Sequence, residues 1–152
     1  MLKRGITVGL GTDGCASNNN MDMFWEMDTA AKIHKVTLLD PTVMSAKTVL
    51  KMATIDGAKL LGLDKLTGSI EAGKQADIIL VDMNQPHLTP LYNYYSQLVY
   101  AARGADVKTS IIGGKIVMKD RQLRTIDLDK AMESVCNIAT DIIAQKQLTA
   151  SQ

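Results

Sequence analysis

Large and small residues alternate along the segment from residue 6 to residue 13. The large apolar residues take every second position and small residues lie between them: Ile6, Val8 and Leu10 against Thr7, Gly9 and Gly11. Alternate side chains of a β-strand face opposite sides, so Asp13 shares a face with the small residues. Such a strand suits a barrel wrapped by helices, and a carboxylate at its C-terminal tip lies where α/β active sites form. Alternatively, Asp13 only caps the loop that follows.

Apolar positions at helical spacing predict two helical regions after this segment. The first spans about residues 21–36, and Asn19 or Asn20 can cap it. The second spans about residues 45–61, as two short helices or as one with a break. His34 lies in the first helix with no second histidine or cysteine at ligand spacing, which favours a half-buried, hydrogen-bonded side chain over a metal ligand.

Short β-type runs follow, and a helix ends the chain. The continuous apolar run 78–81 predicts a buried strand, and Gly113-Gly114 between two apolar runs predicts a hairpin. Asp127 can cap a last helix, followed by a frayed tail of about six residues. The apolar stripe of that helix must pack on this chain's core or on a partner.

Composition narrows the class of protein. The chain has 152 residues, 46% of them hydrophobic, which is enough for a buried core. A net charge of +1 and 4% aromatic residues argue against nucleic acid as a partner, and no apolar run is long enough to cross a bilayer. Cys15 and Cys136 are far apart in the sequence, so we expect reduced, packed thiols and not a disulfide. Together with the absence of a signal peptide before residue 6, this predicts a cytoplasmic protein. His87 lies in a proline-containing loop and is expected at the surface.

Several separated motifs resemble the amidohydrolase superfamily, above all its branch of chlorohydrolases and 5′-methylthioadenosine/S-adenosylhomocysteine deaminases. They occur in the family's order along nearly the whole chain: Gly11-Thr12-Asp13-Gly14, Ser17-Asn18-Asn19, residues 52–58, residues 68–78 and Gly113-Gly114-Lys115. The resemblance implies the C-terminal part of a metal-dependent (β/α)₈ barrel with a small β-sandwich. Residues 1–62 would form the last barrel strand and helices, residues 63–126 the C-terminal share of the composite sandwich, and residues 127–152 a terminal helix and frayed tail.

The resemblance also implies a chemistry for the first motif. The family's matching aspartate, here Asp13, ligates Zn²⁺, contacts the substrate and shuttles a proton of the attacking water. Thr12, Ser17 and Asn18 would form the supporting loop. The implied reaction is attack of water on an aromatic C–NH₂ carbon of a purine nucleoside, with loss of ammonia.

Most of the family's metal ligands have no counterpart in this sequence. A catalytic zinc normally has three protein ligands, whereas the chain has only two histidines and neither matches a ligand position. A complete barrel of this kind needs roughly 250 residues. We therefore expect a C-terminal piece of a longer enzyme, with Met1 an internal methionine, that alone is inactive and retains no zinc.

Two alternatives to this deaminase segment remain open. The longer enzyme could be another hydrolase of the branch, acting on a triazine, guanine or a chloro-substituted heterocycle. The chain could instead be a standalone, non-catalytic domain for oligomerisation or interaction. Because a lone barrel strand and half a sandwich expose unpaired edges, we also expect a homo-oligomer or strand-exchanged dimer, or else a missing partner segment.

Overall fold

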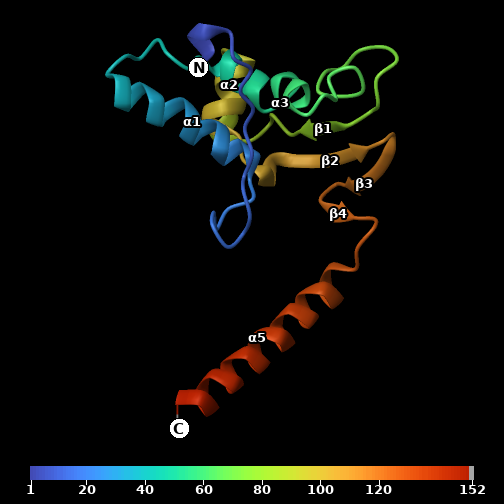
Figure 1. Ribbon diagram of the computed structural model, residues 1–152. Helices are drawn as coiled ribbons and strands as arrows, with labels where there is room; N and C mark the ends of the chain where they lie inside the picture. The colour runs from blue at the N-terminus through green and yellow to red at the C-terminus, as the bar shows by residue number, and fades with distance from the viewer. Residues whose placement is uncertain (151–152) are drawn as a thin grey trace.

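The computed structural model describes residues 1–150, with side chains to residue 147, as a small mixed body and one long helix (Figure 1). Four helices and four strands follow a short 3₁₀ turn at Leu2–Arg4, in the order α1 Met23–Leu38, α2 Ala46–Met52, α3 Ile55–Leu60, β1 Ile78–Val81, α4 Tyr94–Ser96, β2 Val107–Ile112, β3 Lys115–Lys119 and β4 Gln122–Leu123. Shorter turns lie between them: 3₁₀ turns at Pro86–Leu88 and Gly104–Asp106, and a π-helical stretch at Gln97–Ala101 that continues α4. The long helix α5, Leu128–Ala150, ends the described chain.

The four strands form one antiparallel sheet in the order β1-β2-β3-β4. Gly113 and Gly114 both have positive φ, 55° and 77°, as a two-residue hairpin turn requires. The predicted hairpin is therefore confirmed, and so are the bounds of the predicted strand 78–81.

The buried core lies where α1, α2 and the π-helical stretch meet. On α1 the buried residues are Phe24, Met27 and Ala31, whose spacing of three and four positions forms one helical face. The predicted first helix is thus confirmed, two residues later than expected. Its cap is Asp22, whose side chain accepts a hydrogen bond from the backbone N–H of Phe24.

The expected strand over residues 6–13 is not formed, and this prediction is wrong for the described structure. The segment is linked to the helices by one backbone hydrogen bond, from Leu10 N to Met52 O at 3.1 Å. Strand pairing needs a neighbouring strand, and no strand within residues 1–150 lies beside this segment. The small residues still serve packing, since a Cβ on Gly9 would lie 3.0 Å from the Cα of Gly57.

Several burial predictions also fail. Ile79 and Leu80 of β1 are half exposed rather than buried, and His34 is exposed on α1. The expected packed thiols, Cys15 and Cys136, are both free and exposed. In each case nothing among the described residues covers that side of the element. His87 is exposed as predicted, although its Nε2 lies 3.0 Å from Oδ2 of Asp106.

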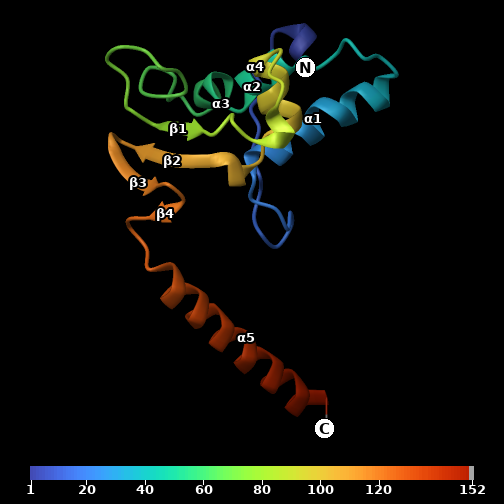
Figure 2. The ribbon, with the colours of Figure 1, turned by 180° about the vertical axis from the view of Figure 1, so that it is seen from behind.

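Helix α5 stands away from the rest of the molecule in both views (Figures 1 and 2). Asp127 caps it as predicted, because its Oδ1 accepts a hydrogen bond from Lys130 N at 3.1 Å. The helix continues to Ala150, so the predicted frayed tail is wrong for residues 147–150. Residues 151–152 of that tail lie outside the described residues. No helix in the described part of the chain is long and apolar enough to span a membrane.

Candidate functional site

The candidate site is the loop of residues 11–20, which joins the extended first segment to α1. Asp13 has a left-handed backbone with φ of 58°, a conformation that aspartate adopts more readily than most residues. Its side chain folds back so that Oδ1 accepts a hydrogen bond from the backbone N–H of Gly14 at 2.7 Å. The carboxylate is exposed at the outside of the loop.

The surroundings of Asp13 favour its charged form. The backbone N–H of Gly14, and after it the hydroxyl of Ser17, hold the pKa of the Asp13 carboxyl below its usual range. The group is therefore ionised at neutral pH. It offers one oxygen ligand for a cation or one acceptor for a proton.

Asn18 anchors the loop to α1. Its Nδ2 donates to the backbone oxygen of Thr12 at 2.8 Å and to Oε1 of Glu26 at 2.7 Å. Ser17 closes the turn, since its Oγ donates to Gly14 O at 3.2 Å. The four residues singled out from the sequence thus lie in one hydrogen-bonded loop.

Two residues that hold this loop and the start of α1 in place, Glu26 and Asp22, were not predicted from the sequence. Glu26 receives the Asn18 amide, and Asp22 caps α1 while its Oδ2 accepts from Gly104 N at 2.8 Å. The only available signal was a pair of acidic residues at the start of a predicted helix, which is common at any helix N-terminus. The pair could not be distinguished from ordinary capping residues by pattern alone.

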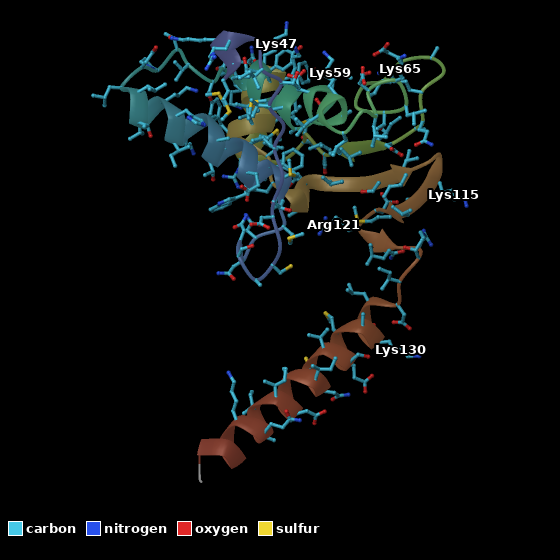
Figure 3. All side chains as sticks on the ribbon, in the orientation of Figure 1. Lys47, Lys59, Lys65, Lys115, Arg121 and Lys130 are labelled. Carbon is cyan, nitrogen blue, oxygen red and sulfur yellow. The ribbon has the colours of Figure 1, made fainter. Side chains whose placement is uncertain are left out.

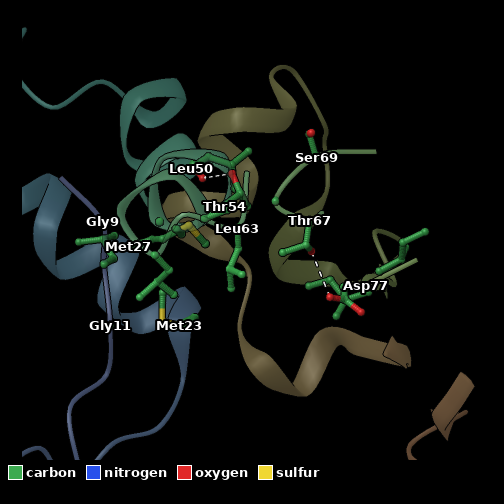
Figure 4. Close-up of a pocket in the computed structure, with 18 of the residues that line it drawn as sticks. Gly9, Gly11, Met23, Met27, Leu50, Thr54, Leu63, Thr67, Ser69 and Asp77 are labelled. Atoms are coloured by element: carbon green, nitrogen blue, oxygen red, sulfur yellow. Dashed lines mark hydrogen bonds between the residues drawn. The ribbon is translucent and has the colours of Figure 1, made fainter. Parts of the chain in front are cut away.

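A large hollow of about 900 Å³ lies elsewhere, between the first segment, α3 and β1 (Figure 4). Its walls are mostly apolar, and Gly9 and Gly11 line one side. Its polar groups are committed to structural bonds: Asp77 Oδ2 accepts from Thr67 Oγ1 at 3.1 Å, and Asp77 Oδ1 accepts from Gly113 N at 2.6 Å. Asp13 is not part of this lining. The hollow is therefore mostly apolar and separate from the candidate carboxylate.

The donor set does not fit a complete zinc site. Within the described residues no group of three or more histidine, cysteine, aspartate or glutamate side chains could hold a metal ion. His34 lies on α1, and His87 is paired with Asp106. Asp13 alone supplies one of the three protein ligands that a catalytic zinc normally has.

Comparison with known proteins decides the family. The model of the Amidohydrolase family matches residues 1–117. The chain belongs to the amidohydrolase family. The resemblance noted from the sequence is thereby confirmed.

The relatives are deaminases of purine nucleosides by name. The chain is 62% identical over 139 residues to the 5-methylthioadenosine/S-adenosylhomocysteine deaminase 1 of Syntrophus aciditrophicus. The matched region covers 91% of this chain and 31% of that protein. The chain is 50% identical over 145 residues to a 5′-deoxyadenosine deaminase of Methanosarcina mazei, covering 95% of this chain and 33% of that one. The chain thus spans about a third of the length of the curated relatives that it matches.

Solved amidohydrolase structures share the arrangement. An adenosine deaminase from Xanthomonas campestris with bound zinc superposes with a TM-score of 0.89 at 40% identity, over 95% of this chain and 33% of that one. The atrazine chlorohydrolase of Arthrobacter aurescens, complexed with zinc, superposes with a TM-score of 0.82 at 25% identity. This superposition covers 90% of this chain and 30% of that enzyme. The structural neighbours thus include an adenosine deaminase and a chlorohydrolase.

Proposed function

We propose that this chain is the C-terminal third of a zinc-dependent amidohydrolase that deaminates 5′-methylthioadenosine or S-adenosylhomocysteine, and that it is inactive alone. The observation that carries the proposal is the 62% identity to a deaminase of that name over 139 residues. In the whole enzyme, residues 1–62 would complete the barrel and residues 63–126 the sandwich. The segment 6–13 would then gain the neighbouring strand that it lacks here.

Asp13 is proposed as the catalytic carboxylate. An ionised, exposed carboxylate can accept a proton from the water whose oxygen attacks the purine carbon that bears the amino group. The same proton can then pass to the amino nitrogen, so that the C–N bond breaks and ammonia leaves. A zinc ion in the whole enzyme would need its remaining ligands from polypeptide other than the residues described here.

The supporting loop has a separate role in this proposal. Thr12, Ser17 and Asn18 hold the turn in which Asp13 lies, and Asn18 fixes that turn to Glu26 of α1. A carboxylate on a bonded loop keeps its position when substrate arrives, which proton transfer over hydrogen-bond distance requires. We also propose a cytoplasmic location, which two free cysteines fit.

A triazine-type substrate is the second candidate. The superposition on atrazine chlorohydrolase supports it, at a TM-score of 0.82. The identity to that enzyme is 25%, against 62% for the S. aciditrophicus deaminase, so a purine nucleoside is favoured.

The test is ammonia release by a chimera in which this chain replaces the segment that it matches in the S. aciditrophicus relative. We expect the chimera to release ammonia from 5′-methylthioadenosine, faster than it converts atrazine, and the isolated chain to release none. A folded chimera without deaminase activity, or an isolated chain that deaminates, would contradict the proposal.

A further inference from the structure

Helix α5 carries a continuous apolar face that nothing among the described residues covers. This α5 apolar face consists of Leu128, Ala131, Met132, Val135, Ile138, Ala139, Ile142 and Ile143. Its large side chains are about half exposed, from 49% at Ile142 to 65% at Val135. Burial of such side chains is the main favourable contribution to helix packing, so a face of this kind requires an occupant.

The face has a definite direction. At 3.6 residues per turn, its centre lies roughly 150° around the helix from Lys130. Figure 3 shows Lys130 on the side of α5 that is turned away from the body. The α5 apolar face is therefore turned toward the side on which the loop of residues 11–20 lies (Figures 1 and 3).

The position of α5 is shared with a much longer protein. The superposition on the X. campestris deaminase covers 95% of 152 residues, which leaves at most about eight outside it. At least about 15 of the 23 residues of α5 are then included, at a TM-score of 0.89. In that protein, the matched third is accompanied by about twice its own length of further polypeptide.

The width of the face distinguishes between two packing partners, a second copy of α5 and the core of a larger domain. A helix that pairs with a second copy of itself needs only a narrow seam at two positions of each heptad. The α5 apolar face is wider, because Met132, Ala139 and Ile143 extend it over roughly 140° of the helix surface. Such a width is typical of a helix that packs on the core of a larger domain.

We propose that the α5 apolar face is the docking surface for the polypeptide that makes up the other two thirds of the amidohydrolase fold. That polypeptide lies between α5 and the side of the body that carries residues 11–20. The long helix thus holds the two parts of the enzyme together on the side of Asp13. This inference rests on packing and does not require the proposed deaminase activity.

The experiment is co-expression of this chain with the part of the S. aciditrophicus relative that it does not match, followed by affinity purification through a tag on that part. We expect the wild-type chain to co-purify in equal amounts and Val135→Asp to reduce its recovery at least tenfold. Asn137→Asp is the matched control, because it introduces the same carboxylate on the polar face, and it should change recovery less than twofold. Equal circular dichroism of the three purified chains would exclude unfolding as the cause.

Three results would overturn the proposal. One is recovery of Val135→Asp equal to that of the wild type, and another is failure of the wild-type chain to co-purify. The third is a stable dimer of the isolated chain, measured by light scattering, that Val135→Asp dissociates, because the occupant would then be a second copy.

Discussion

Replacing Asp13 with asparagine is expected to lower the kcat of the deaminating chimera by about 10²–10⁴-fold, the usual contribution of a general acid–base group. Asparagine has the same size, tolerates the left-handed backbone of this position and can still accept the hydrogen bond from Gly14. It cannot take a proton from water at neutral pH, and it lacks the charge of the carboxylate. The measurement is the steady-state rate of ammonia release from 5′-methylthioadenosine.

Asp120→Asn is the matched control for this substitution. Asp120 is also an exposed aspartate with positive φ, 50°, and lies at the turn between β3 and β4. The control should keep the kcat of the unmodified chimera within about twofold, because surface substitutions of this kind change little. Retention of full activity by Asp13→Asn would remove Asp13 from the catalytic machinery.

Replacing Leu88 with alanine is expected to lower the free energy of unfolding by about 2–5 kcal/mol. Leu88 is 0% exposed and is the largest of the fully buried side chains among the described residues. Its removal leaves a cavity in the buried core, to which Val49 and Val99 also belong. Against a total stability of about 5–15 kcal/mol for a typical domain, this loss is large. Urea unfolding followed by circular dichroism measures it.

Leu61→Ala provides the comparison at the surface. Leu61 is 71% exposed at the end of α3, so the same change should alter the free energy of unfolding by no more than about 0.5 kcal/mol. If Leu61→Ala destabilised the chain as much as Leu88→Ala, the location of the core would be wrong.

Local patterns were sufficient where an element depends on its own residues. The turn Gly113-Gly114 fixes the β2–β3 hairpin because few other residues adopt its positive φ angles. The helix over Met23–Leu38 follows from apolar residues at helical spacing. The strand Ile78–Val81 follows from its length and its branched side chains.

Patterns failed where the outcome depends on a neighbour. The alternation in residues 6–13 describes a strand, but strand hydrogen bonds need a second strand beside it. Ile79 and Leu80 are half exposed for the same reason, because burial is a property of what covers a residue. The exposed His34 and Cys136 belong to faces that the described residues leave open.

The candidate residues could be named only by combining periodicity with motif resemblance. Periodicity placed Asp13 at the end of an extended segment, and the resemblance added Thr12, Ser17 and Asn18. The carboxylate of Glu26 was missed, because its bond to Asn18 spans a loop whose shape no local rule specifies. Asp22 was missed because Asn19 and Asn20 are equally good capping residues by type.

The central claim is that this chain supplies one carboxylate to a metal centre that other polypeptide completes. Its most direct test is the zinc content per chain, measured by elemental analysis. We expect near-zero zinc in the isolated chain and about one zinc in the chimera, since a catalytic zinc needs about three protein ligands. About one zinc per isolated chain would contradict the claim, because the missing ligands would then have to come from this sequence, with Cys15, His34 and His87 as the first residues to test.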